Sequence, residues 1–295
     1  MGNQLKKFGK APLGDKIFII LIYILLAAIM LVVFLPLVYI VSASFSDPQA
    51  VISNEVWFLP VRPTLRGYQA VFKNRNILTG FANSFYYMIV GTLVNIVMTV
   101  MCAYPLSRKE FTARNKVAMI FVFTMYFSGG LIPGYLLIKD LGMINSRLSL
   151  ILPGAVSTFN LMIMITGFEG IPESLEESAR IDGAGDWTIL FRIIMPLAKP
   201  TIMVILLYYA VGHWNAWFHA MIYLRDADKM PLQIFLRDIL TRSQLGAMTG
   251  QTDVEDVGQT IKYATIIVST VPILCVYPFI QKHFVKGVMI GAVKE

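Results

Sequence analysis

The chain of 295 residues is 56% hydrophobic and only 15% charged, whereas an ordinary water-soluble domain is about a quarter charged, so a soluble globular protein is excluded. Its formal net charge of +7 is spread over the ends and loops of apolar runs, and no separate basic domain for nucleic acid is indicated. Cys102 and Cys275 both fall inside apolar runs, which favours packing residues over a disulfide or a metal site.

Six apolar runs follow one another and predict an all-α polytopic membrane protein. The first, residues 17–41, contains no Asp, Glu, Lys, Arg or His, and at about 1.5 Å per residue it can cross a hydrocarbon core of about 30 Å. It is much longer than the apolar core of a cleavable signal peptide, so we expect a retained anchor. The other runs are residues 80–105, 117–138, 148–168, 201–224 and 263–281. All six are expected to be helical because lipid offers no water to open backbone groups.

Basic residues near the ends of these runs predict the orientation in the cell membrane. Residues 1–16, the segment between the second and third runs, residues 169–199 and residues 282–295 carry Lys or Arg and share one side. Positive charge favours the cytoplasm, so both ends of the multi-pass domain 17–281 are expected to be cytoplasmic. The opposite loops are also basic, but they are longer, and the charge rule weakens in long loops.

The two long outward loops have different compositions. The first lies between the first and second runs and holds Trp57, Phe58 and Tyr68, which suits a segment at the membrane interface. The second, residues 225–262, contains a set of apolar residues that could line one face of a short surface helix, namely Ile234, Leu236, Ile239 and Leu240. A linker and a partner-binding loop are both compatible with this second loop.

The sequence lacks the motifs of several chemistries. It has no G-x-x-x-x-G-K-[ST] loop for nucleotide phosphates, and no Asp, Glu, Lys or Arg inside the six runs. His213 and His219 alone interrupt the fifth run, and hydrogen bonding to a neighbour is the favoured role for each. No metal-spaced cluster and no serine–histidine–acid set can be assembled, so neither catalytic nor metal-binding residues are predicted. Energy for any transport would have to come from another subunit.

A polar segment, residues 169–199, interrupts the apolar runs. Pro172 suits the first position of a helix, and Glu173, Glu176 and Glu177 crowd its amino-terminal turns, where the helix dipole favours negative charge. A helix of about two turns is too short to be stable alone, so it needs a surface to pack against.

The same segment then bends and becomes helical again. Gly183 and Gly185 allow a tight bend, and Asp186 is expected to cap a second helix over residues 187–195. Pro196 interrupts regular helix before the fifth run.

The order of residues in this segment resembles the EAA loop of ABC importer permeases, whose pattern is E-A-A-x3-G-x9-I-x-L-P. The matching positions here are Glu177, Ser178, Ala179, Gly183, Ile193 and Pro196. Ser178 stands in place of the middle alanine and Met195 in place of leucine. By resemblance, Glu177 would face basic groups in a groove of a cytoplasmic ATPase and Ala179 would permit close packing. Gly183 would turn the chain, and Asp182, on the same helical stripe as Ala179, is counted with the residues that couple to the ATPase.

The resemblance extends over nearly the whole chain. "CAYPLSR" (102–108), "GHWNAWFHAMIYL" (212–224) and the carboxy-terminal "FVKGVMIGAVKE" (284–295) are similar to maltose-type sugar permeases. The opening and the first loop resemble LplC/YtcP-type oligosaccharide permeases. The resemblance implies the type I ABC importer permease fold. It also implies a second related permease, two copies of an ATPase that hold ATP and Mg²⁺, and an extracytoplasmic solute-binding protein probed by residues 225–262. No cofactor is expected in this chain itself.

A path for an uncharged sugar through the bilayer needs amides, hydroxyls and aromatic faces. The available groups are Asn83, Ser84, Asn95, Tyr104, Asn160, Trp214, Asn215 and Trp217. Each is either a helix–helix hydrogen-bonding residue or a path residue, and Asn83, Trp214 and Asn215 are the preferred path residues.

The hypothesis is therefore a permease subunit that gives alternating access to a carbohydrate, an oligosaccharide in particular. An importer permease for an amino acid or polyamine, an ATP-independent membrane carrier or membrane enzyme, and a membrane scaffold remain as alternatives.

Overall fold

The computed structural model describes residues 12–249 and 261–275, and within these ranges the protein is helical with no strand, which confirms the all-α prediction. These residues fall into two compact units. The first unit comprises residues up to Val71 together with Arg242–Ile267, and the second comprises Phe72–Thr241 together with the described residues from Val268 onward.

The first unit is dominated by α2 (Leu13–Ser44), one continuous helix of 32 residues that contains the first predicted span. Its apolar side chains are exposed around the helix, with Val32 71% exposed. After α2 the chain packs into a small core of Ala43, Ala50, Val51 and Val56 that includes α3 (Pro48–Ile52). Trp57 and Phe58 are exposed beside this core, consistent with a segment at the membrane interface.

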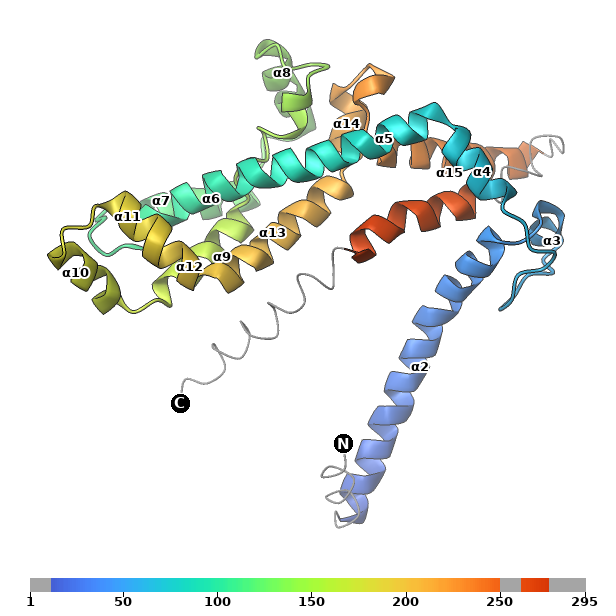
Figure 1. Cartoon of the computed structure of the whole chain (residues 1–295), viewed down its shortest axis with the longest axis horizontal. Coiled ribbons are helices and arrows are strands. Elements are labelled where there is room, and N and C mark those ends of the chain that lie inside the picture. The colour runs from blue at the N-terminus through green and yellow to red at the C-terminus, as the bar shows by residue number, and fades with distance from the viewer. Residues whose placement is uncertain (1–11, 250–260, 276–295) are drawn as a thin grey trace. The chain divides into compact units, whose positions relative to one another are not determined.

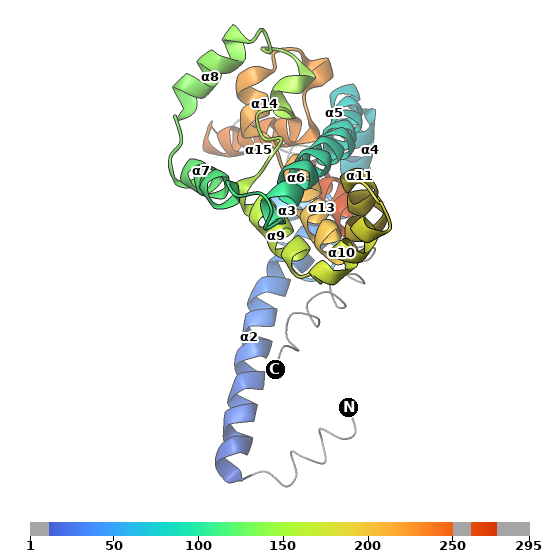
Figure 2. The ribbon, with the colours of Figure 1, turned by 90° about the vertical axis from the view of Figure 1, so that its left-hand side faces the viewer.

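The second unit is built on one long helix, residues 75–107, formed by α5 (Arg75–Tyr86), η1 (Tyr87–Gly91) and α6 (Thr92–Ser107). This helix contains the second predicted span. Helices α9 (Thr158–Glu169) and α13 (Lys199–Trp214) pack beside α6 through a core that includes Ala103, Leu161 and Ile205 (Figures 1 and 2). The π-helical turn η1 lies against α13, where Gly91 leaves room for the ring of His213.

The third predicted span is wrong as a single helix. Residues 117–138 are divided between α7 (Arg114–Tyr126) and α8 (Leu131–Asp140), whose axes meet at 113°. The chain turns at Gly130, whose φ of 87° is easily adopted only by a residue without a Cβ atom. Figure 2 shows α8 apart from the α6, α9 and α13 group.

The fourth predicted span is also interrupted. The short helix η2 (Arg147–Leu150) is followed by an irregular segment, residues 151–157, before α9 begins. Pro153 removes one backbone donor and so disfavours regular helical bonding at this point of the chain. Asn95 donates its amide to the carbonyls of Gly154 (2.6 Å) and Ala155 (2.9 Å), and therefore replaces part of the missing helical bonding.

The fifth predicted run, residues 201–224, is helical over α13, which ends at Trp214, and a separate short helix, α14 (Phe218–Tyr223), follows. The described part of the sixth run lies in the helix Ile261–Cys275. Two helices in the described residues are long and apolar enough to cross a membrane, or up to four when each bent helix pair counts as one span. The structure therefore does not establish the predicted count of six.

The second outward loop is more ordered than expected. After η4 (Ala227–Lys229) it forms α15 (Leu232–Thr249), so the predicted surface helix is present and longer than expected. Leu232 and Leu236 are the buried residues of its first turns, while Ile234 is half-buried. The remaining described element, α4 (Arg66–Lys73), precedes α5. The predicted tail, residues 282–295, and most of the segment 1–16 lie outside the described residues.

Candidate functional site

The polar segment, called here the EAA loop (residues 169–199), folds as two short helical pieces joined by a bend. The first piece is α10 (Glu173–Ile181), nine residues long, as predicted. The bend lies at Gly183, whose φ is 81°. The second piece runs through α11 (Asp186–Ile189), the π-helical turn η3 (Leu190–Ile194) and α12 (Met195–Leu197).

The predicted cap at Asp186 is wrong. Gly185 occupies the capping position, and Asp186 is the first residue of α11. Its carboxylate instead forms an ion pair with Arg180 at 2.8 Å and so links the two helical pieces across the bend. Negative charge in the first turn remains favourable because of the helix dipole.

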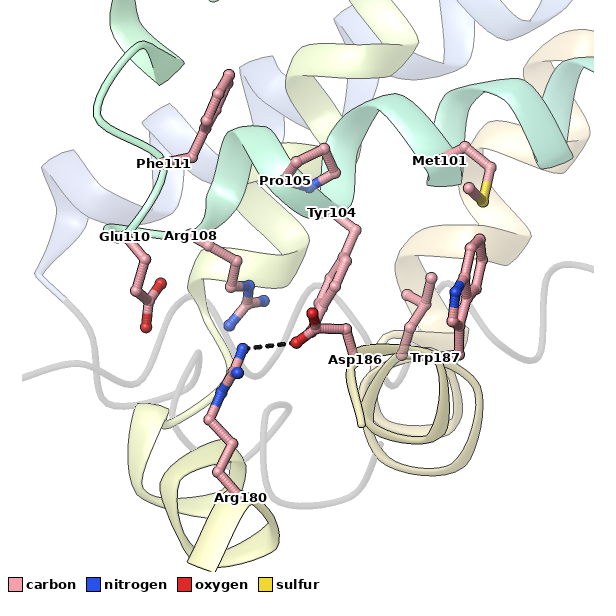
Figure 3. Close-up of a pocket in the computed structure, with 10 residues that line it drawn as sticks. Met101, Tyr104, Pro105, Arg108, Glu110, Phe111, Arg180, Asp186 and Trp187 are labelled. Carbon is pink, nitrogen blue, oxygen red and sulfur yellow. Dashed lines mark ion pairs between the residues drawn. The ribbon is translucent and has the colours of Figure 1, made fainter. Parts of the chain in front are cut away.

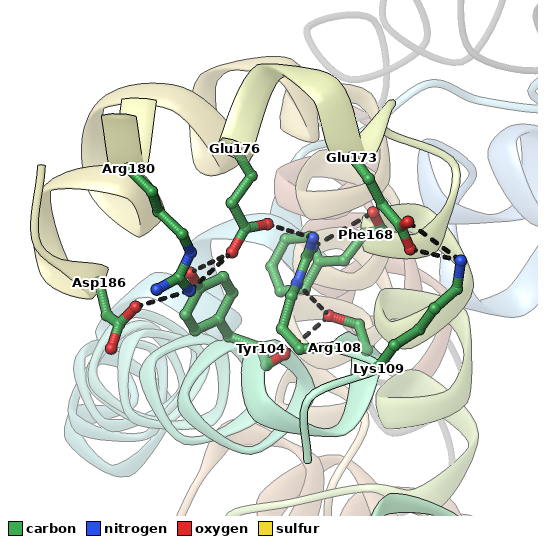
Figure 4. A network of polar contacts seen from close by, with 9 residues as sticks. Tyr104, Arg108, Lys109, Phe168, Glu173, Glu176, Arg180 and Asp186 are labelled. Atoms are coloured by element: carbon green, nitrogen blue, oxygen red, sulfur yellow. Dashed lines mark hydrogen bonds and ion pairs between the residues drawn. The ribbon is translucent and has the colours of Figure 1, made fainter. Parts of the chain in front are cut away.

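An almost fully buried ion pair joins the EAA loop to the end of α6. Glu176 is 5% exposed and Arg108 is 9% exposed, and Arg108 Nη1 donates to Glu176 Oε2. The hydroxyl of Tyr104 donates to Glu176 Oε1 at 3.1 Å, and Arg180 Nη2 lies 3.3 Å from the same oxygen (Figure 4). Arg108 also donates to the carbonyl of Phe168 at 3.4 Å. The carboxylate and the guanidinium are thus paired and hydrogen-bonded, the condition under which a buried charge pair persists.

A second ion pair lies at the exposed side of the same junction. Lys109 Nζ is 2.8 Å from Glu173 Oε1, with both side chains largely exposed (Figure 4). The hydrogen bond from Lys109 lowers the pKa of the Glu173 carboxyl below its ordinary value. Exposed pairs of this kind contribute little to stability because water and salt screen them.

The EAA loop has an inner apolar side and an outer exposed side. Ala179, Ile189 and Ile194 are buried in the core that α6, α9 and α13 share. The small side chain of Ala179 therefore permits close packing within this chain. The motif residues on the exposed side are Glu177, Ser178, Asp182, Gly183 and Pro196, while Ile193 is half-buried against the core.

A cleft of about 490 Å³ separates the end of α6 from the EAA loop (Figure 3). Its wall combines apolar and charged side chains from both elements, namely Met101, Tyr104, Pro105, Arg108, Glu110, Phe111, Arg180, Asp186, Trp187 and Leu190.

Asn83 and Trp214, two of the three preferred path residues, are buried and hydrogen-bonded to backbone carbonyls of this chain. Asn83 is 3% exposed; its amide donates to the carbonyls of Asp228 (2.8 Å) and Met230 (3.0 Å), and its Oδ1 accepts from Arg147 at 2.9 Å. Asn83 therefore holds the turn before α15 in place, with its amide nitrogen and oxygen both bonded within this chain.

Trp214 is 2% exposed and donates from Nε1 to the carbonyl of Ser269 at 3.2 Å. Its ring lies edge-on to that of Phe85, 5.2 Å between centroids, so its contacts are those of a core residue. Asn215 caps the carboxyl end of α13 and is exposed. Of the three residues, Asn215 is the exposed one, and all three stay predictions as path residues.

Sequence reasoning counted Tyr104 among the possible path groups and Arg108 in a stretch similar to sugar permeases, but it did not predict that both contact Glu176. The buried face of α10 is marked by Glu176 and Ala179, three residues apart and hence neighbours on a helix. Tyr104 and Arg108 both occur in the stretch "CAYPLSR", which contains the only arginine adjacent to the end of the second run. Pairing that arginine with the neighbouring acidic loop would have suggested the contact.

Comparisons with known proteins agree over almost the whole chain. The family model described as "Binding-protein-dependent transport system inner membrane component" matches residues 8–290. The "Polygalacturonan/rhamnogalacturonan transport system permease protein YtcP" of Bacillus subtilis (strain 168) is 41% identical over 95% of this chain and 99% of its own length. "Protein LplC" of the same organism is 42% identical over 88% of this chain and 89% of its own length.

A solved structure shows the same fold. It is titled "Crystal structure of a bacterial ABC transporter involved in the import of the acidic polysaccharide alginate", and one chain of it superimposes with a TM-score of 0.87 at 34% identity. The match covers 93% of this chain and 99% of that chain.

Proposed function

The chain belongs to the binding-protein-dependent transport system inner membrane components, a family of membrane transport subunits and not of enzymes, and on this basis we propose that it is the permease subunit of an ABC importer for an oligosaccharide. The carbohydrate substrate is supported by the sugar polymers in the names of its relatives. Alternating access would come from movement of α6, α9 and α13, which form the core of the second unit.

The observation that carries this proposal is the two-sided EAA loop. Glu177 and Asp182 are exposed on its outer side, while Glu176, one residue away, is buried against Arg108. A partner that pushes on the outer side therefore pushes on an element that is fixed to the end of α6 by a buried ion pair. Force is transmitted only if the connection is rigid, and a buried charge pair resists separation because each charge alone would be costly.

The partners follow from the same proposal. An ATPase with bound ATP and Mg²⁺ would contact the outer side of the EAA loop on the cytoplasmic side of the cell membrane, and two copies would serve this chain and a second related permease. An extracytoplasmic solute-binding protein would approach α15, and both termini would lie in the cytoplasm. The exposed apolar surface of α2 would be covered by lipid or by the second permease.

The test is sugar uptake by proteoliposomes that contain both permeases, the ATPase and the binding protein. Exchanging Glu177 for arginine is expected to abolish uptake of a radiolabelled oligosaccharide while the complex stays inserted and continues to hydrolyse ATP. A matched pair of neutral variants, Glu177→Gln and Glu173→Gln, compares the motif carboxylate with another exposed carboxylate on α10.

We expect a large loss of uptake with Glu177→Gln and little loss with Glu173→Gln. Normal uptake with arginine at position 177 would rule out the coupling role. Uptake of an amino acid or polyamine, with no sugar taken up, would rule out the carbohydrate assignment.

A further inference from the structure

A row of aromatic rings lies at the end of α13 that is farthest from the EAA loop. α13 starts beside the EAA loop and ends at Trp214, and the chain then passes through Trp217 into α14. Successive ring centroids are 5.5 Å (Trp217 to Phe218), 5.8 Å (Phe218 to His219), 5.7 Å (His219 to Tyr223) and 6.4 Å (Tyr223 to Tyr135) apart. These five residues are called the aromatic row. Phe218 is 41% exposed and His219 is exposed, so the row has an accessible side.

Arg237 on α15 stacks on the first ring of this row. Its guanidinium carbon lies 3.8 Å from the centroid of the Trp217 ring, and the side chain is exposed. This contact uses the flat face of the guanidinium, whereas its N–H donors lie in the plane of the group and are not used by the stack. A carboxylate can therefore bind the edge of Arg237 in a bidentate manner without disturbing the stack.

Arg147 differs from Arg237 because it uses its hydrogen-bonding edge inside the protein. It also lies over an aromatic ring, that of Tyr86 at 4.7 Å, but its Nη2 donates to the buried oxygen of Asn83 at 2.9 Å. Among the ion pairs formed by residues 12–249 and 261–275, Arg237 is not a partner. The structure thus holds Arg237 in place through Trp217 and leaves its hydrogen-bonding edge accessible.

We propose that Arg237 and the aromatic row form a binding site for an acidic oligosaccharide. The guanidinium of Arg237 would bind the carboxylate of one uronic acid residue, and the exposed rings of Phe218 and His219 would pack against the apolar C–H faces of the adjoining sugars, with Tyr223 buried behind them. The inference rests on the proposed function and adds to it the chemical class of the substrate. It also assigns specificity to residues that the EAA loop does not contact.

The test measures equilibrium binding to the purified complex of both permeases and the ATPase, without the solute-binding protein, so that the preference of that protein does not contribute. The probes are trigalacturonate and its fully methyl-esterified form, which differ in charge and not in their rings. Variants are Arg237→Gln, Arg237→Lys and Trp217→Leu, and Arg225→Gln is the matched control because Arg225 is also an exposed arginine of the same region. The thermal midpoint of each complex in detergent shows that it is folded.

Loss of a charged hydrogen bond predicts that Arg237→Gln weakens trigalacturonate binding by about tenfold or more and leaves binding of the ester unchanged. Arg237→Lys should be intermediate because it keeps the charge without the planar fork. Trp217→Leu should weaken the binding of both probes, and Arg225→Gln should weaken the binding of neither.

An equal effect of Arg237→Gln on both probes, no effect on either, or failure of the unchanged complex to bind trigalacturonate would overturn the site. Sugar uptake by the unchanged complex tests the proposed function separately, so transport of the ester alone would refute this site and leave the carbohydrate importer standing.

Discussion

Arg108 and Glu176 are 68 residues apart in the chain, yet each buries its charge against the other at the junction of α6 and the EAA loop. Glu177, the next residue along, faces outward. The two neighbouring glutamates therefore differ in their surroundings: Glu176 holds the loop to α6, and Glu177 is the one that we propose to face a partner.

The first prediction concerns this buried pair. Arg108→Ala leaves the carboxylate of Glu176 buried without its main partner, and breaking such a pair costs about 3–5 kcal/mol. We expect a clear fall in the thermal midpoint of the complex in detergent and a loss of sugar uptake. Lys109→Ala removes one partner of the neighbouring exposed pair and serves as the control, because it should leave the midpoint nearly unchanged. Equal effects of the two substitutions would show that burial does not set the strength of this contact.

The second prediction concerns the bend of the EAA loop. Gly183 has a φ of 81° and no atom within 4 Å of the position that a Cβ would take, so the cost of Gly183→Ala is conformational and not steric contact with neighbours. That cost is about 1–2 kcal/mol for a residue with a Cβ in the left-handed region. Gly185→Ala is the matched control, since Gly185 has equally open surroundings and a φ of −78°.

We expect lower uptake and a lower thermal midpoint for Gly183→Ala only, with Gly183→Asn less affected because asparagine tolerates this conformation. If alanine at position 185 proved as damaging as alanine at 183, the backbone conformation would not be the cause.

The third prediction separates a positioning role from a substrate role for Asn83. Its amide holds the turn at Asp228 and Met230, and its oxygen accepts from Arg147. Asn83→Ala and Arg147→Met should each lower the thermal midpoint, and the double variant should lose less than the sum because both break one network. Binding of the sugar to the folded complex should keep its affinity. A large fall in affinity with an unchanged midpoint would restore Asn83 to the substrate path.

The fourth prediction is a pH dependence at the base of the second outward loop. Hydrogen bonds from Lys229 and Asn145 lower the pKa of Asp226 below its ordinary value. Between the ordinary aspartate pKa of about 3.9 and the lower folded value, the unfolded chain binds more protons, so stability falls as the pH falls through this range.

Thermal midpoints of the complex measured down through this pH range should show the loss in the unchanged protein and a smaller loss in Asp226→Asn. Parallel curves for the two proteins would mean that Asp226 makes no contribution.

Local residue patterns predict part of the structure. The glutamates after Pro172 and the glycine at position 183 specify a short helix and a bend by local chemistry, and both are present. The apolar spacing in residues 232–240 likewise predicts the surface helix that became α15.

The parts that could not be predicted depend on contacts between distant residues. A long apolar run does not reveal that the chain leaves the helix at residues 151–157, because that break is supported by Asn95 on α6 and by Tyr209 on α13. Which of Glu176 and Glu177 is buried is also undetermined locally, since the choice depends on Arg108. The breaks at positions 130 and 151–157 are therefore the reason why the apolar runs counted in the sequence are not all regular helices in the structure.

The irregular segment also has a consequence for biogenesis. An intact helix enters a bilayer with its backbone polar groups already bonded, but this segment must obtain bonds from other helices. The carbonyls of Gly154 and Ala155 accept from Asn95, which is synthesised before them. The N–H of Ser157 donates to the hydroxyl of Tyr209, which is synthesised after it. A nascent chain that ends between residues 157 and 209 therefore lacks the hydroxyl that accepts from the N–H of Ser157 in the folded protein.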